Sequence, residues 1–109
     1  NLGIMDRRVF TIADDTAVSF APLDLFGMMT IAQIASLGSN MIRFRVNGSP
    51  QCAVAITSAN TAVTTGVLTG TTGVDGNTTI SAHSDGKIYI ENRRGTSATV
   101  VVTIPAAVF

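Results

Sequence analysis

Hydrophobic and polar residues alternate with a period of two over much of the chain. Ile42, Phe44 and Val46 are apolar and are separated by single polar positions. Arg43 and Arg45 occupy the positions between them and share the opposite face of an extended chain. A helix would place the two arginines on neighbouring rather than identical sides, so the alternation predicts a half-buried strand.

The same alternation follows a turn later in the chain. It places Ile88 and Ile90 inside the fold. The residues beside them, Lys87, Tyr89 and Glu91, are predicted to face outward.

The stretch 98–104 is rich in Val, Ile and Thr, whose branched Cβ atoms favour strands. Its even-numbered residues are predicted to be buried, and Thr99, Val101 and Thr103 to lie on the other face.

Turn-forming residues separate the alternating stretches. The pair Asp85-Gly86 between two such stretches is the strongest hairpin signal. Strands are predicted at 9–13, 17–21, 41–46, 52–57, 62–68, 78–83, 87–92 and 98–104. About eight short strands at regular spacing predict an all-β fold, a single antiparallel β-sandwich or jelly-roll-like domain over 1–109.

The segment 25–37 allows two interpretations. Phe26, Met28 and Thr30 alternate as in a strand, whereas Met28, Ile31 and Ile34 would also form the stripe of a short helix. We favour a strand because the rest of the chain is all-β. The uncharged stretch from Leu25 to Ile42 is 18 residues long, but its Gly, Ser, Gln and Asn residues argue against a membrane-spanning helix.

Charge and composition narrow the class of protein. Seven Lys and Arg balance seven Asp and Glu, and a neutral chain is a poor nucleic-acid binder. Only 13% of residues are charged while 46% are hydrophobic, against about 25% charged in typical domains. The composition predicts a component of an assembly. We further expect a homo-oligomer, with a trimer favoured, and no nucleic acid or membrane as partner.

Catalytic constellations are nearly absent from the sequence. His83, Ser84 and Asp85 follow one another directly, and three successive residues cannot form a catalytic triad with each other. His83 is therefore interpreted as a turn histidine. Cys52 among small apolar residues is interpreted as an inert core thiol. Asp14 and Asp15 are adjacent and are expected to cap a turn rather than to bind a metal. We expect no enzyme activity, no cofactor and no metal site.

Carbohydrate-binding modules usually present Trp or Tyr side chains. The chain has no Trp and a single Tyr, Tyr89. Because Tyr is also enriched at protein interfaces, a sugar contact and an interface anchor both stay open for it.

Three segments are expected to contact a partner: 1–8, 57–79 and 105–109. Residues 1–5 and 105–109 are apolar. The pairs Arg7-Arg8 and Arg93-Arg94 are either solvated or dock on acidic patches of a partner. Segment 57–79 holds nine Thr and four Gly, as in a solvated connector or an arm that lies on a neighbouring subunit. The candidate interface residues are Leu2, Ile4, Met5, Arg7, Arg8, Tyr89, Arg93, Arg94, Val108 and Phe109.

The stretches 66–77, 85–95 and 10–22 resemble small virion structural proteins of tailed bacteriophages. Their shared motifs are strands and turns, so the resemblance carries over no catalytic residue. It implies a β-sandwich that decorates or cements a capsid, bound to the major capsid protein on the outer shell after assembly in the host cytoplasm. The alternative that it implies is a receptor- or glycan-binding module of a spike or tail fibre.

Overall fold

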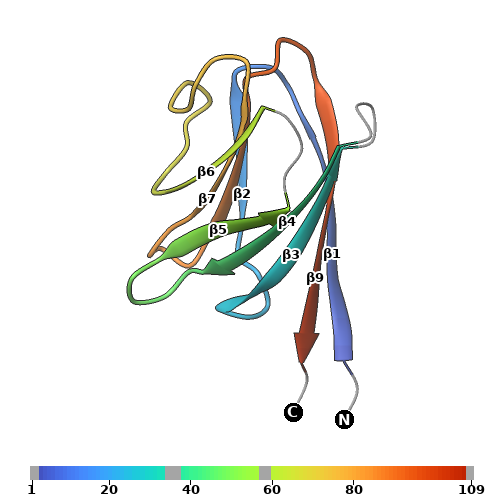
Figure 1. Ribbon diagram of the computed structural model, residues 1–109, viewed down its shortest axis with the longest axis vertical. Coiled ribbons are helices and arrows are strands. Elements are labelled where there is room, and N and C mark those ends of the chain that lie inside the picture. Colours follow the sequence, from blue (N-terminus) through green and yellow to red (C-terminus); the bar gives the residue numbers. More distant parts are fainter. Residues whose placement is uncertain (1–2, 34–37, 57–59, 108–109) are drawn as a thin grey trace.

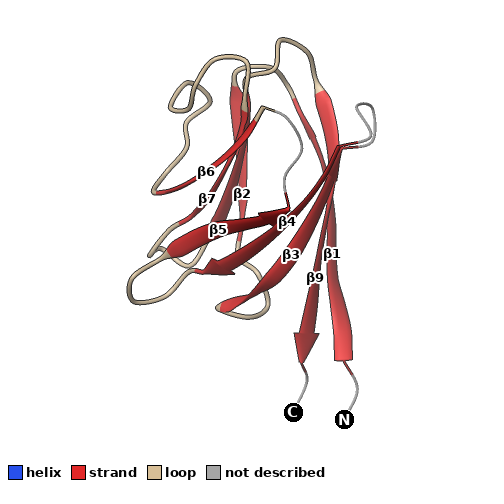
Figure 2. Cartoon of the chain, viewed as in Figure 1, coloured by secondary structure: helices blue, strands red, loops and turns tan. Residues whose placement is uncertain are grey.

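The computed structural model describes residues 3–33, 38–56 and 60–107. These residues form nine strands and no helix (Figures 1 and 2). The strands are β1 (Gly3–Ile12), β2 (Thr16–Phe20), β3 (Phe26–Gln33), β4 (Gly38–Arg45), β5 (Gln51–Ile56), β6 (Thr61–Thr65), β7 (Thr78–Ala82), β8 (Ile88–Asn92) and β9 (Ala98–Ala107).

The strands form two sheets, which pack face to face as a β-sandwich. One sheet has five strands in the order β1-β9-β3-β4-β5, and the other has four in the order β2-β8-β7-β6. The predicted all-β fold is therefore confirmed. Within segment 25–37, where a strand is favoured over a helix, residues 26–33 form the central strand β3, and residues 34–37 lie outside the described part of the chain.

The core lies between the two sheets and follows the predicted alternation. Ile42, Phe44 and Val46 are buried, as are Ile88 and Ile90. On β9 the buried residues are Val100, Val102 and Ile104. On β3 the buried residues are Met29, Ile31 and Gln33, so Phe26 and Met28 lie on the outer face of the five-stranded sheet.

The pairing of β6 with β7 differs from the prediction of an antiparallel fold. These two strands run parallel, with Thr61 opposite Thr78 and Thr65 opposite Ala82. A parallel pair requires a long connection that returns the chain to the starting end. Residues 66–77 supply it as a folded loop, which we call the 66–77 loop.

β1 begins earlier than predicted. Residues 3–8, ahead of the predicted 9–13, are part of the strand, because β9 pairs with β1 over its whole length, from Gly3–Ala107 to Ile12–Ala98. β3 pairs with β9 only over residues 100–103 of β9. Residues 3–6 and 104–107 therefore pair only with each other and form a two-stranded extension, which we call the terminal ribbon (Figure 1). At its base Asp6 and Ile104 are buried.

Candidate functional site

Glu91 lies in a position opposite to the one predicted. The alternation places it outside, but it is 0% exposed. Its carboxylate accepts backbone hydrogen bonds from Gly70 (2.8 Å), Thr72 (3.0 Å) and Gly73 (2.7 Å). The 66–77 loop thus folds over the outer face of β8, and its backbone N–H groups surround the Glu91 carboxylate. Successive backbone N–H groups bind free anions in other proteins in the same way.

Arg93 and Ser81 hold the same loop in place. The Arg93 guanidinium donates to the carbonyl oxygen of Gly73 (2.9 Å) and pairs with Asp15 (3.0 Å), which raises the pKa of Arg93. The Ser81 hydroxyl donates to the carbonyl oxygen of Gly66 (2.6 Å). Within the predicted arm 57–79, residues 66–77 therefore contact their own domain, and residues 57–59 lie outside the described part of the chain.

Arg8 is engaged at the base of the terminal ribbon. Its Nε lies 2.9 Å from the Asp6 carboxylate, and its Nη2 donates to the carbonyl oxygen of Ala21 (2.8 Å). The guanidinium also lies over the Phe20 ring at 4.9 Å from the centroid. The backbone nitrogen of Leu23 donates to the other Asp6 oxygen (3.0 Å), so this cluster fixes the loop after β2 beneath β1.

The remaining candidate interface residues lie in different places. Met5 and Arg7 are exposed on β1, and Arg94 is half-buried after β8. Tyr89 is half-buried and donates its hydroxyl to Asp85. Ile4 belongs to β1, but its side chain is not described. Leu2, Val108 and Phe109 lie outside the described residues.

Cys52 and His83 lie on different sheets. Cys52 is on β5 and packs against the core, where burial raises its thiol pKa to about 12. His83 lies in the turn after β7, where its backbone nitrogen bonds the Lys87 carbonyl oxygen (3.1 Å) and its ring meets the edge of Tyr89. The protonated thiol is a poor nucleophile.

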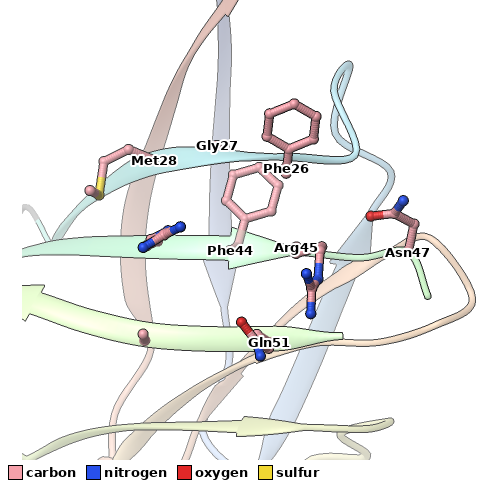
Figure 3. Close-up of a pocket in the computed structure, with 9 residues that line it drawn as sticks. Phe26, Gly27, Met28, Phe44, Arg45, Asn47 and Gln51 are labelled. Atoms are coloured by element: carbon pink, nitrogen blue, oxygen red, sulfur yellow. The ribbon is translucent and has the colours of Figure 1, made fainter. Parts of the chain in front are cut away.

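The outer face of the five-stranded sheet carries a hollow of about 540 Å³ across β3, β4 and β5 (Figure 3). Two rows of directly paired residues cross it: Phe26–Arg45–Gln51, and Met28–Arg43–Ala53. Phe26, at the rim of the hollow, is 69% exposed.

Two arginines dominate the electrostatics of the hollow. Arg45 donates through Nε (3.0 Å) and Nη2 (2.8 Å) to the carbonyl oxygen of Ser49, which fixes its guanidinium. Arg43 is exposed, and within the described residues no carboxylate forms an ion pair with either arginine. Asn47 and Gln51 add two side-chain amides to the lining.

The structure therefore brings together a set of residues that the sequence analysis did not select. The alternation did place Arg43 and Arg45 on one exposed face. It carried no information on the strand that lies beside them, so the neighbouring Phe26 could not be assigned to the same site. Tyr89, the aromatic residue that was selected, lies on the opposite sheet.

Comparison with known proteins gives no relative: no protein-family model, no curated protein and no solved structure matches the chain. In the described part of the chain, no helix is long and apolar enough to span a membrane. Among the same residues, no group of three or more His, Cys, Asp or Glu side chains is placed to hold a metal ion.

Proposed function

We propose that the chain is a non-enzymatic structural protein of a virion, a decoration or cement protein that binds the outside of a phage capsid. The terminal ribbon is the observation that carries this proposal. Its two segments pair only with each other. Met5 on the ribbon is 57% exposed and Val9, further along the same face, is 50% exposed.

A two-stranded ribbon is marginally stable alone in water and gains from further pairing or packing. The outer edge of β1 offers unpaired backbone groups to which an extended segment of a partner can add as a strand. Pro105 is exposed in the ribbon where β9 has no β3 partner, and proline is tolerated at such sheet edges.

In this proposal the ribbon attaches each copy to the shell, and the apolar side chains beside it cover the joint between capsid subunits. Copies grouped around a local symmetry axis, as trimers, would each bury the same patch. Because each copy would bind the assembled shell and not the free capsid subunits, its binding would stabilise the shell by mass action. The choice of the capsid as the partner rests on the resemblance of the sequence to phage virion proteins.

Co-sedimentation tests the proposal. Purified protein is mixed with empty phage shells that lack it and, separately, with host cell envelopes, and the bound fraction is measured. We expect saturable binding to shells at a stoichiometry that matches the capsid lattice. Binding to envelopes alone would overturn the capsid proposal and favour an adhesion module.

Point variants locate the contact. Met5→Glu puts a charge on the ribbon and is expected to weaken shell binding at least ~10-fold, since a buried unpaired charge is unfavourable. Val74→Glu is the matched control, because Val74 is 68% exposed on the 66–77 loop of the other sheet. Equal binding by both variants would exclude the ribbon as the attachment site.

A further inference from the structure

The hollow over β3, β4 and β5 is lined by polar and charged side chains that have no role in the proposed attachment through the terminal ribbon. The ribbon presents exposed Met5, with Val9 further along the same face, whereas the hollow gathers two guanidinium groups, two amides and an exposed aromatic ring. A concave site of 540 Å³ falls in the range of small-ligand sites, about 300–1,000 Å³. The hollow is therefore a candidate site in its own right.

The two arginines of the hollow are suited to bind an anion from outside the chain. None of the described residues that line it is Asp or Glu, although the whole chain contains as many acidic as basic residues. Arg43 and Arg45 stand two residues apart on one face of β4, and the Ser49 carbonyl holds Arg45 in a fixed orientation. Guanidinium groups recognise carboxylates through paired hydrogen bonds, and an oriented one loses less freedom on binding.

The other lining groups narrow the chemistry of the ligand. Phe26 offers an exposed ring on which an apolar face can stack. Asn47 and Gln51 each provide an N–H₂ donor and a carbonyl acceptor, a combination that suits hydroxyl groups. A ligand with a carboxylate, several hydroxyls and one apolar face satisfies all of them.

We propose that the hollow binds an acidic saccharide unit, a uronic-acid residue of a polysaccharide. The sugar ring would stack on Phe26, its carboxylate would bind Arg43 and Arg45, and its hydroxyls would bond Asn47 and Gln51. The site lies on the opposite sheet from Tyr89 and is lined by β3, β4, β5 and the turn after β4, whereas the terminal ribbon belongs to β1 and β9. It thus adds a ligand to the protein independently of shell attachment.

Calorimetric titration tests the proposal with hexagalacturonic acid as the probe. Maltohexaose serves as a neutral sugar of equal length, a hexaglutamate peptide as an acidic segment without a sugar, and inorganic phosphate as a simple anion. We expect binding of the uronate alone among the four, with affinity that falls as salt increases.

Variants tie the binding to the hollow. Arg43→Gln and Phe26→Ser are each expected to weaken uronate binding at least ~10-fold, because both side chains are exposed and their loss leaves the core intact. Arg7→Gln is the matched control, since Arg7 is an exposed arginine on β1, separated from β4 by two strands. Urea unfolding midpoints equal to that of the wild type show that the variants are folded.

Four outcomes would overturn the proposal. They are no uronate binding at millimolar concentration, equal binding of maltohexaose, equal binding of hexaglutamate or phosphate, and an equal loss with Arg7→Gln. Equal binding of hexaglutamate would reassign the hollow to an acidic segment of a partner protein. Shell binding is measured separately, so failure here leaves the ribbon-based proposal standing.

Discussion

The Oε1 atom of Glu91 lies 2.7 Å from the backbone nitrogen of Gly73, across the boundary between a strand and the loop that covers it. The same carboxylate bonds the nitrogens of Gly70 and Thr72 through Oε2. A buried charge is tolerated only when its hydrogen bonds are satisfied, and here backbone donors supply them. The position of the 66–77 loop therefore depends on one side chain of β8.

Glu91→Gln is predicted to destabilise the protein by about 2–4 kcal/mol. The variant removes the charge and turns an N–H₂ group toward backbone donors, which leaves buried groups unpaired. Urea denaturation measures the loss. Asp75→Asn is the control, since the Asp75 side chain is 81% exposed and its pair with Arg93 is long at 3.8 Å. The control should change stability by less than about 0.5 kcal/mol, and an equal effect of both variants would contradict the role of Glu91.

Gly73→Ala is predicted to destabilise the protein by about 1–3 kcal/mol through crowding. A Cβ at this position would clash with Thr79 Oγ1 and lie 2.7 Å from Glu91 Oε1. The loop would have to move away from the carboxylate that holds it. Thermal unfolding compares this variant with Val74→Ala, which changes the exposed neighbour. A Gly73→Ala variant as stable as the wild type would show that the loop shifts freely.

Acid is predicted to weaken the fold through Asp6. Burial raises the pKa of this carboxyl, but the hydrogen bonds from Arg8 and the Leu23 nitrogen, with the Arg8 charge, outweigh it and lower the pKa below its ordinary 3.8. The folded state therefore releases this proton more readily than the unfolded state. Its stabilising contribution is present above pH 3.8 and is lost as pH falls through the lowered pKa.

The measurement for Asp6 is the free energy of unfolding of the wild type and of Asp6→Asn at several pH values. The difference between the two should be constant near neutral pH and shrink at the acid end, where the wild-type carboxyl is also neutral. A difference independent of pH would assign the effect of the variant to packing alone.

Cys52 is predicted to resist thiol reagents in the folded state. The rise in its pKa from 9.0 to about 12 lowers the thiolate fraction about a thousandfold. Reaction with Ellman's reagent at pH 8 should be at least ~100-fold slower in the native protein than in urea. Rapid reaction of the native protein would show that β5 opens readily.

Periodicity was sufficient to predict most strands, because one face of each packs on the opposite sheet. It failed at Glu91, where a loop rather than solvent covers the outer face of β8. The only hint in the sequence is an isolated acidic residue near a Gly- and Thr-rich stretch whose N–H groups need acceptors. Such a partnership between residues 18 to 21 positions apart has no periodic signal.

The candidate site was less predictable than the fold. The exposed arginines of β4 follow from alternation, but the position of Phe26 beside Arg45 depends on the register between β3 and β4. Likewise, the parallel pairing of β6 and β7 depends on how the 66–77 loop folds. Register and loop conformation are set by tertiary contacts, which a single sequence does not reveal.

The pairing of Gly3 with Ala107 places the first and last described residues of the sandwich side by side. A short linker between these residues would close the polypeptide into a ring, and new ends could be opened in the exposed turn at Asn47–Ser49 without breaking any strand pair. For the same reason the whole unit could be spliced into a surface loop of an unrelated host protein as a side branch. Cargo fused at either end would be displayed at a single location.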